Sequence, residues 1–272
     1  METDEVLETG YGPRTPRGDN LTNDFAQGEA DAFAALADAR GDRRLDDDEF
    51  VLMLRDGASG SPFGNVAVLR RPLSDDEWRA AATRMHDFFA QGPGGPFMVF
   101  SAWPTPNLRD LGFGLVGHPP MMLRPAGPRE LPLPDGLEIR RVDDAASAAD
   151  WEYVMVHGYP VPEVQPFAPG CILPESALAA EGWRHFLGVV DGKPVATGSA
   201  YVDPQHIHVE FISALDEARG RGIGAALTTV ATTTEIDRPA MLIASDAGKP
   251  TYDRMGYQTL SRFTLWAGHR RS

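Results

Sequence analysis

Two spacings of hydrophobic residues alternate along the chain, and together they predict a protein built from strands and helices. Short apolar runs bounded by turn residues predict strands in the first half at residues 50–55, 65–70, 97–102 and 118–124. Helical spacing predicts helices at residues 23–39, 75–91 and 107–111. Ser74 and Glu77 form a capping box at the start of the second of these helices, and Gly92-Pro93 ends it.

The second half repeats this mixture of elements. Strands are expected at residues 137–142, 185–190, 194–202, 207–214, 240–244 and 257–266. Helices are expected from a cap at Asp143 or Asp144 to His157, and at residues 176–181, 222–234 and 250–255. The proline-rich residues 158–174 are expected to form a loop over a site. Strands that alternate with helices predict an α/β layered fold.

A stretch rich in proline and glycine, PAGPRELPLPDG, divides the chain near its middle. Such a composition is typical of a linker between domains. The first residues carry glycine, proline and charge without periodicity, which is typical of a loosely packed terminus. We therefore expect a flexible arm at 1–20, a first domain at 21–125, a linker at 126–136 and a second domain at 137–272.

The two halves share an internal similarity. Residues 107–113 (NLRDLGF) align with residues 251–257 (TYDRMGY) at an offset of 144, which is 252 minus 108. At this offset the strand at 65–70 falls near residues 210–215, and the helix at 75–91 falls on the helix that follows Gly222. The same order of elements in both halves predicts a duplicated domain.

Charge and cysteine content narrow the classes of function. The net charge of -14 argues against binding to nucleic acid or to an anionic membrane, and it is compatible with an amine-bearing substrate. Cys171 is the only cysteine, which excludes an intramolecular disulfide, and we expect it to be inert. The N-terminus METDEVLETG lacks an apolar signal core, and no run is long enough to span a membrane. We therefore expect a cytoplasmic protein.

A glycine-rich segment, Arg219-Gly220-Arg221-Gly222-Ile223-Gly224, lies between a predicted strand and a predicted helix. The first N–H groups of a helix have no internal partners and attract anions, and glycines let a diphosphate approach the backbone. The G-x-G-x-x-G spacing of dinucleotide-binding folds is absent, as is the Gly-Lys-Ser/Thr of a Walker loop. A glycine-rich turn without a ligand remains the alternative interpretation.

This segment resembles the phosphate loop of the GNAT acyltransferase superfamily, Arg/Gln-x-x-Gly-x-Gly/Ala, through Arg219, Gly222 and Gly224. A second motif of that family, a tyrosine on a short helix before a Gly-aromatic pair, is matched by Tyr252 and Gly256-Tyr257. The resemblance covers residues 137–266 well and residues 45–125 only through the repeat. It implies two GNAT-like domains, each with a mixed, mostly antiparallel sheet flanked by helices, and acetyl-CoA as co-substrate without a metal.

The resemblance also implies positions for the co-substrate. The backbone N–H groups from Arg219 to Gly224, including those of Gly220, Arg221 and Ile223, would hold the pyrophosphate. The strand end at Ile212, Ser213 and Ala214 would pair with the pantetheine arm. Ser245 follows the next strand and could touch the co-substrate, although relatives often carry asparagine there.

An N-acyltransferase also needs a general acid and a general base. Tyr252 matches the family position of the acid for the CoA sulfur, and its alternative role is packing. Glu210 or His208 could be the base, because the family often places Glu or His on this strand. The strand periodicity puts both side chains on one face together with Ile212, and His206 lies further out. Either could instead be an ordinary strand residue.

The remaining expectations concern the acceptor and the first half. Trp151, Tyr153, His157 and Tyr159 lie where the family builds its acceptor pocket, although aromatic residues there more often pack in the core. The first half has acidic residues at 75–77 in place of the phosphate loop and Leu108 in place of the tyrosine, so we expect it to bind no CoA. We expect a small-molecule or peptide amine as substrate and a monomer or homodimer. Two alternatives are a non-catalytic acyl-CoA-binding or regulatory protein and an unrelated nucleotide-binding enzyme.

Overall fold

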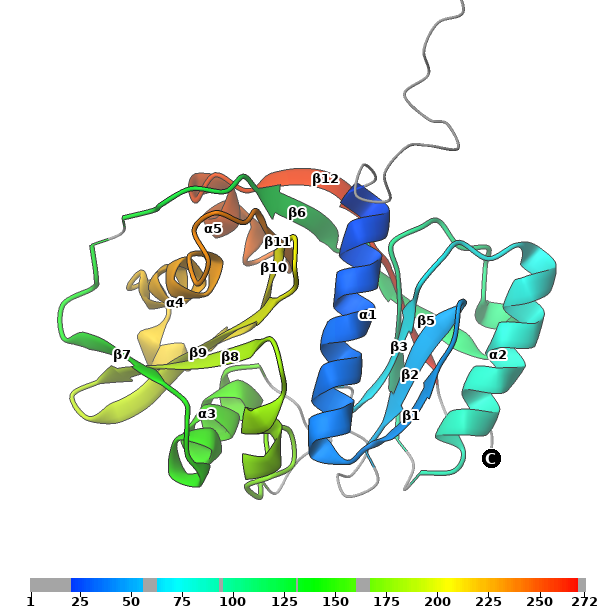
Figure 1. The fold of residues 1–272 in the computed structure, drawn as a ribbon, viewed down its shortest axis with the longest axis horizontal. Coiled ribbons are helices and arrows are strands. Elements are labelled where there is room, and N and C mark those ends of the chain that lie inside the picture. The colour runs from blue at the N-terminus through cyan, green and yellow to red at the C-terminus, as the bar shows by residue number, and fades with distance from the viewer. Residues whose placement is uncertain (1–20, 56–62, 93–94, 131, 160–166, 269–272) are drawn as a thin grey trace, which may run out of the picture.

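The computed structural model describes residues 21–55, 63–92, 95–130, 132–159 and 167–268. Within these ranges the chain forms two β-sheets, of six and seven strands, with helix α1 (Leu21–Arg40) between them (Figure 1). The predicted arm at 1–20 and part of the predicted loop at 158–174 lie outside the described residues. None of the helices in the described ranges is long and apolar enough to cross a membrane.

The seven-stranded sheet contains most of the second half of the chain, in the order β12-β6-β11-β10-β9-β8-β7. Its strands are β6 (Pro120–Arg124), β7 (Leu137–Arg141), β8 (Trp183–Val190), β9 (Lys193–Val202), β10 (Ile207–Ala214), β11 (Ala240–Ile243) and β12 (Gln258–Arg262). Neighbouring strands are antiparallel, except that β10 and β11 are parallel. Short helices lie at η4 (Glu175–Ala179), η5 (Asp216–Ala218) and α5 (Lys249–Arg254).

Helices α3 (Ala145–Gly158) and α4 (Ile223–Thr232) cover opposite faces of this sheet. Leu187 of β8 packs with the buried face of α3, whereas Val190 of the same strand packs with α4. Odd and even positions of a strand point to opposite faces, so the two contacts place the helices on different sides. Of the two predicted caps, Asp144 is the one that caps α3. Its side chain accepts a hydrogen bond from the backbone N–H of Ser147.

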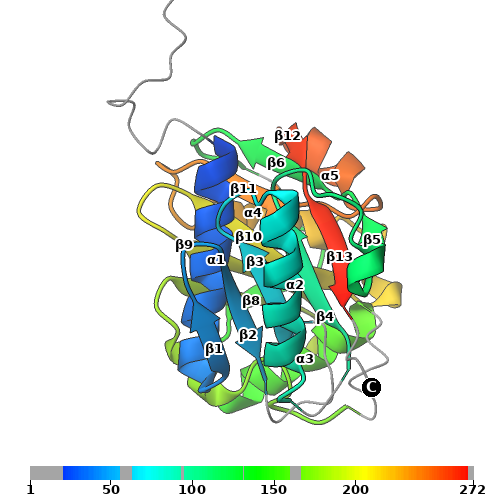
Figure 2. The same cartoon turned by 90° about the vertical axis from the view of Figure 1, so that its right-hand side faces the viewer.

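The six-stranded sheet has the order β1-β2-β3-β4-β13-β5. Its strands are β1 (Arg43–Asp46), β2 (Phe50–Leu54), β3 (Asn65–Leu69), β4 (Phe97–Ser101), β5 (Phe113–Gly117) and β13 (Thr264–Gly268). Helix α2 (Asp75–Phe89) covers the face that contains Leu52 and Leu54, and α1 covers the face that contains Val51 and Met53 (Figure 2). A single 3-10 turn, η2 (Arg109–Leu111), precedes β5.

The two halves of the chain exchange their last strands. Strand β6 comes from the first half and lies between β11 and β12 of the seven-stranded sheet. Strand β13 comes from the end of the chain and lies between β4 and β5 of the six-stranded sheet, where Figure 2 shows it. Each sheet is therefore completed by a strand from the other side of residues 126–136. The division into domains at this linker stays a prediction. It separates two stretches of the chain, although each sheet contains strands from both stretches.

The exchange follows the internal duplication. At the offset of 144, β6 at 120–124 corresponds to β13 at 264–268, because 120 plus 144 is 264. Strand β4 and turn η2 likewise correspond to β11 and α5, and β3 and β4 are parallel as β10 and β11 are. The fold of two similar halves, each a mostly antiparallel sheet with flanking helices, agrees with the expectation from the sequence.

Helix α1 is buried on more than one face because it packs against both halves. Phe33 and Ala34 contact the six-stranded sheet, whereas Ala32 and Leu36 belong to the core of the second half. Alanine is frequent along this helix, and its small side chain lets both sheets approach the helix axis closely. This close packing brings polar side chains of α1 next to β10.

Most predicted elements are confirmed within a few residues, and three expectations were wrong. The expected strand at 257–266 is two strands, β12 and β13, which belong to different sheets. Hydrophobic residues with a period of two indicate a strand but not its partner strands. The sequence therefore did not show that the chain passes from one sheet to the other at buried Phe263. Strands β1 and β5 were not expected, and the helix expected at 107–111 is only the η2 turn.

Candidate active site

The predicted phosphate loop connects η5 to α4 and leaves the start of α4 open. Gly222 is the N-cap of α4 with φ of 80°, and no side chain caps the first N–H groups of the helix. A Cβ atom on Gly220 or Gly224 would meet no atom within 4 Å. The loop therefore presents free helical amides to open space, which suits an anionic group such as a diphosphate.

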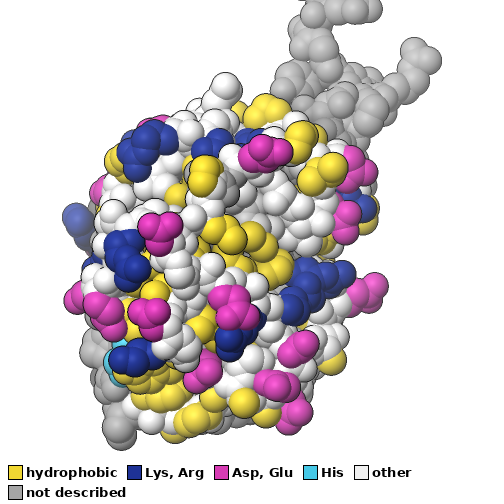
Figure 3. Space-filling view, turned by 90° about the vertical axis from the view of Figure 1, so that its left-hand side faces the viewer, with side chains coloured by type: hydrophobic (Ala, Val, Ile, Leu, Met, Phe, Trp, Pro, Cys, Tyr) yellow, Lys and Arg dark blue, Asp and Glu magenta, His cyan; other side chains and the backbone are white. Residues whose placement is uncertain are grey.

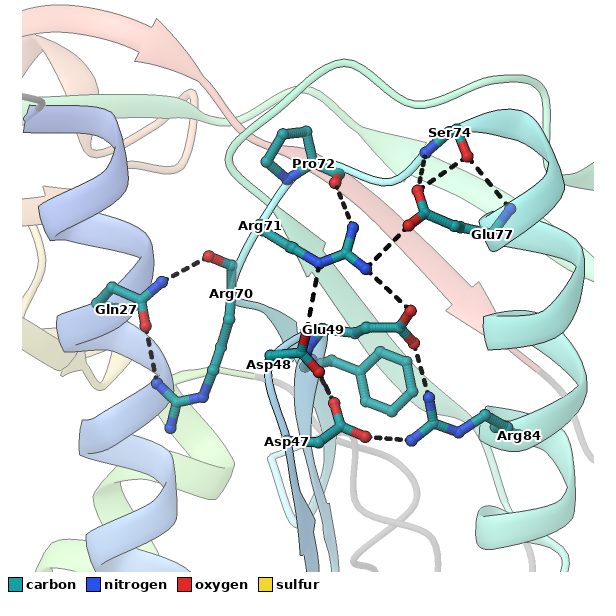
Figure 4. Close-up of polar contacts among 11 residues, drawn as sticks. Gln27, Asp47, Asp48, Glu49, Arg70, Arg71, Pro72, Ser74, Glu77 and Arg84 are labelled. Carbon is teal, nitrogen blue, oxygen red and sulfur yellow. Dashed lines mark hydrogen bonds and ion pairs between the residues drawn. The ribbon is translucent and has the colours of Figure 1, made fainter. Parts of the chain in front are cut away.

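The corresponding position in the first half is closed. At the start of α2, Ser74 accepts a hydrogen bond from the N–H of Glu77, and the Glu77 carboxylate accepts one from the N–H of Ser74 (Figure 4). Arg71 holds the same carboxylate at 2.9 Å. Asp75 and Asp76 add negative charge to the first turn. The capping box occupies amides at the start of α2, whereas no side chain caps those at the start of α4.

Arg219 ties the loop to the rest of the second half. Its guanidinium donates hydrogen bonds of 2.6 Å to the carbonyl oxygen of Gly158 and 3.2 Å to that of Ala214. It also pairs with Asp216 at 2.8 Å. The side chain therefore fastens the end of α3 to the end of β10, while the backbone of the loop stays available. Arg221 is exposed on the same loop.

Strands β10 and β11 separate near the middle of the sheet. They pair only at Ile207 with Ala240 and at His208 with Met241. Beyond His208 no described strand pairs with this edge of β10, although β9 continues to pair on the other edge as far as Ala214. An unpaired strand edge can hydrogen-bond an extended ligand. Ile212, Ser213 and Ala214 lie on this stretch, and their pairing with the pantetheine arm stays a prediction.

A β-bulge interrupts β10 at the same place. The register with β9 shifts between Glu210 and Ser213, and Phe211 has a φ of 53°, which is strained for a bulky side chain. The expectation that Ile212 shares a face with His208 and Glu210 was wrong. Ile212 lies on the face of the sheet that α4 covers. A Cβ atom on Gly198 would lie 2.9 Å from Cδ1 of Ile212 and 3.2 Å from Cβ of Leu227 in α4. The bulge adds one residue and so inverts the alternation.

Glu210 lies at the start of the bulge beside a second carboxyl group. Its Oε1 is buried without a hydrogen-bond partner, and Glu29 of α1 lies within hydrogen-bonding reach. Burial and the neighbouring Glu29 carboxyl raise the pKa of Glu210 well above its ordinary value. A carboxylate with a raised pKa accepts a proton more readily than an ordinary one, which fits a general base.

His208 is fully buried and lies between two carboxyl groups. Its Nε2 is 3.0 Å from Oδ2 of Asp203, and its Nδ1 is 3.6 Å from Oε2 of Glu29. Burial alone would lower the pKa of His208, but the hydrogen bond to Asp203 and the nearby Glu29 carboxyl group raise it above its ordinary value. Phe25 of α1 stacks on the ring at 5.2 Å. This enclosure separates His208 from any substrate, so Glu210 is the better candidate for the base.

Tyr252 lies on α5 near the open edge of β10. Burial and the nearby Glu210 and Tyr159 raise the pKa of Tyr252 to about 12. The phenol therefore stays protonated at neutral pH, as a general acid requires. Its ring packs over Gly248, because a Cβ there would lie 2.9 Å from Cε2 of Tyr252. The predicted co-substrate contact Ser245 already has a partner, because its Oγ accepts a 3.1 Å hydrogen bond from the N–H of Gly248.

The predicted acceptor region divides into core and surface residues. Trp151 is buried and packs edge to face on Phe211, so it supports the bulge. Tyr153, His157 and Tyr159 are exposed. Phe63, from the first half, packs against Tyr159 at 5.6 Å and Phe211 at 6.3 Å between ring centroids. An aromatic side chain of the first half therefore reaches the region of the predicted pocket.

The linker packs along the outer side of α4. Arg129 donates a 2.9 Å hydrogen bond to the carbonyl oxygen of Met255, and a cavity of about 610 Å³ lies between the linker and α4. Its lining includes Leu133, Ala226 and Val230. Figure 3 views the molecule from this side, where hydrophobic side chains show between interspersed basic and acidic ones.

Burial and the adjacent Glu152 raise the pKa of the Cys171 thiol to about 12, which makes its thiolate scarce and agrees with an inert residue. Among the described residues, no group of three or more His, Cys, Asp or Glu side chains could hold a metal ion. Sequence reasoning missed Glu29, because a glutamate in an alanine-rich helix has the pattern of an exposed residue.

Comparison with known proteins finds similarity to acetyltransferases. Residues 151–257 match the model of the acetyltransferase (GNAT) family. The structure is similar to a GCN5-related N-acetyltransferase from Kribbella flavida, at 20% identity over 92% of this chain and 96% of that chain, with a TM-score of 0.65. The GCN5-related N-acetyltransferase from Sphaerobacter thermophilus gives 17% identity, 92% and 94% coverage and a TM-score of 0.55.

A conserved protein of unknown function from Staphylococcus epidermidis is also similar, at 14% identity over 85% of this chain and 95% of that chain, with a TM-score of 0.58. None of the curated proteins matches the sequence. Residues 151–257 therefore match the GNAT family, and the fold of the whole chain is similar to that of the GCN5-related N-acetyltransferase from Kribbella flavida.

Proposed function

We propose that the protein is an N-acyltransferase that transfers an acyl group from acyl-CoA directly to an amine. The observation that carries this proposal is the uncapped start of α4 beside the open edge of β10. The first feature suits a diphosphate and the second suits an extended arm with amide groups. Acyl-CoA contains both groups in one molecule, whereas a nucleoside triphosphate or a dinucleotide lacks the extended amide arm.

The bulge supports a role for the β10 backbone in the acyl transfer itself. The strained φ of Phe211 turns the local peptide groups away from the regular ladder with β9. An N–H group that points into the open edge would donate a hydrogen bond to the thioester oxygen. The tetrahedral intermediate places negative charge on that oxygen, so the donor would stabilise it more strongly than the substrate.

Glu210 is proposed as the base and Tyr252 as the acid. The acceptor enters as an ammonium ion, and Glu210 takes its first proton, directly or through water. The amine nitrogen then bonds to the thioester carbon, the carbon–sulfur bond breaks, and the nitrogen loses a second proton. Tyr252 gives its proton to the sulfur and regains one from the nitrogen, because tyrosinate is a stronger base than a thiolate. One proton leaves to solvent for each amide formed.

The identity of both substrates is proposed at the level of chemical class. Acetyl-CoA is the expected donor, and the acceptor is a small-molecule or peptide amine, as the acidic surface of the chain also favours. The single cysteine is in keeping with a reducing cytoplasm. A monomer or homodimer remains the expectation for the assembly.

The test of the proposed function is ligand-induced stabilisation of the whole chain. Thermal unfolding is followed with acetyl-CoA, CoA, ATP and NAD at equal concentrations. Because a ligand that binds only the folded state raises the Tm, acetyl-CoA and CoA should raise it and the two other nucleotides should not. Equal shifts with ATP or NAD would contradict the assignment of the site to coenzyme A.

A further inference from the structure

One carboxyl group from the first half of the chain lies beside the proposed general base of the second half. Glu29 is 1% exposed and lies on α1, while Glu210 lies on β10. The two carboxyl groups are within hydrogen-bonding reach of each other. Two ionised carboxylates cannot share such a buried place without strong repulsion. A single proton between them removes the repulsion and forms a hydrogen bond.

The other oxygen of Glu29 has its own charged neighbour. Oε2 of Glu29 faces Nδ1 of His208 at 3.6 Å, and both atoms are buried and have no hydrogen-bond partner among the described residues. On the opposite side of the ring, Nε2 of His208 is 3.0 Å from Asp203. His208 thus connects Asp203 to Glu29 and compensates the remaining negative charge of the carboxyl pair.

Packing fixes this arrangement. A Cβ atom on Gly28 would lie 2.1 Å from Nε2 of His208 and 2.8 Å from Oδ2 of Asp203, so only glycine allows α1 this close to β10. Phe25, one turn away, stacks on the His208 ring at an interplanar angle of 6°. These contacts place α1 close against β10, where Glu29 is 1% exposed.

From this juxtaposition we propose that Glu29 is a positioning residue of the active site, which shares one proton with Glu210 and thereby sets the pH at which Glu210 accepts a proton. The proposal rests on the proposed function, because it gives Glu210 the role of base. It also gives the first half a direct part in the reaction, beyond support of the second half.

Other charged or titratable groups surround the pair and must be counted. His206 and Asp203 lie on the turn before β10, Arg238 donates a hydrogen bond to the backbone of Asp203, and Asp24 and Asp31 lie on α1. The set is completed by Tyr201 on β9, His185 on β8, Tyr252 on α5 and Tyr159 at the end of α3. Burial keeps His185 neutral by lowering its pKa to about 3, and Arg70 pairs with Asp31 at 2.9 Å. Glu29 is therefore the carboxyl group placed to act on Glu210.

The decisive variant is Glu29→Gln, which keeps the shape and removes the charge. Without the second carboxyl group, Glu210 ionises more easily, so the rising limb of the kcat–pH profile should move to lower pH by about one unit or more. The plateau rate should fall as well, because a less basic carboxylate accepts the amine proton less readily. Glu29→Asp keeps the charge and should leave the limb close to its wild-type position. Asp31→Asn is the matched control on the same helix and should leave it unchanged.

A second measurement does not depend on turnover. The infrared carbonyl band of a protonated carboxyl group is followed against pH in the wild-type protein, Glu29→Gln, Glu210→Gln and Asp31→Asn. A band should persist near neutral pH in the wild type, disappear in Glu210→Gln, lose its proton at lower pH in Glu29→Gln and be unchanged in Asp31→Asn.

A wild-type protein without that band, or a Glu29→Gln midpoint that does not move, overturns the shared proton. Failure of the proposed function gives a different result: acetyl-CoA would not raise the Tm, whereas the infrared titration would still decide the state of the carboxyl pair.

Discussion

Gly28 of α1 and His208 of β10 approach so closely that a single added carbon would collide with the imidazole ring at 2.1 Å. The ring cannot move aside, because Phe25 stacks on it and Asp203 holds its Nε2. This contact joins the two halves of the chain at the strand that carries the proposed base.

Gly28→Ala should therefore destabilise the protein, although alanine is the better helix former. Overpacking costs about 1–3 kcal/mol, whereas replacing glycine in a helix returns up to about 1 kcal/mol. We expect a net loss of about 1–2 kcal/mol in the free energy of unfolding, measured by urea denaturation. Gly117→Ala, where a Cβ would meet nothing within 4 Å, is the matched control. Equal stability of Gly28→Ala and the wild type would show that α1 is not docked this closely.

Gly224→Glu tests the anion site without straining the backbone. The side chain would enter open space at the start of α4, where a carboxylate suits the helix dipole, so the fold should be kept. A carboxylate facing a diphosphate costs several kcal/mol, so acetyl-CoA affinity should fall by a factor on the order of a hundred or more. Gly224→Lys has a similar size and the opposite charge, and it should bind more tightly than Gly224→Glu in calorimetric titrations. Tighter binding of acetyl-CoA by Gly224→Glu than by Gly224→Lys would contradict a diphosphate site at this loop.

Tyr252→Phe should slow the reaction and leave binding of acetyl-CoA nearly unchanged. Loss of a general acid lowers kcat by a factor on the order of a hundred, whereas the ring still packs over Gly248. Tyr257→Phe is the control, because the Tyr257 hydroxyl hydrogen-bonds to Thr232 at 2.6 Å in the core, so its loss should affect stability instead of kcat. Normal turnover by Tyr252→Phe would contradict the assignment of Tyr252 as the general acid.

Glu210→Gln should change how stability depends on pH. The pKa of Glu210 is raised in the folded state, so the folded protein binds more protons than the unfolded chain above the ordinary Glu pKa of about 4.3. The wild type therefore loses stability as pH rises toward the folded pKa, by at most about 1.4 kcal/mol per unit from this group. Glu210→Gln lacks this loss, so its advantage in urea denaturation should grow with pH across that window. A constant difference would contradict the raised pKa.

Local signals in the sequence predicted much of the fold. The capping box of Ser74 and Glu77 marked the start of α2, and the glycines after Arg219 marked the start of α4. These features act through neighbouring residues, so a short stretch of sequence contains the whole interaction. The motif with Tyr252 was found in the same way, and the structure brings it near Glu210.

Non-local features could not be predicted. The exchange of β6 and β13 depends on pairing with strands far away in the chain, and strand periodicity does not name a partner. The bulge requires Phe211 to adopt a φ of 53°, a conformation that its residue type disfavours. Glu29 acquires its neighbour only when α1 docks on β10, where Gly28 gives the needed space.

The central claim is that the loop at the start of α4 and the open edge of β10 hold acyl-CoA for attack by an amine. The most direct measurement is release of free thiol from acetyl-CoA, followed with a panel of primary amines and with Glu210→Gln in parallel. The account predicts amine-dependent release by the wild type and a rate lower by a factor on the order of a hundred in Glu210→Gln. Binding of acetyl-CoA without release for any amine would contradict transfer, and release at equal rates by both proteins would contradict the assigned base.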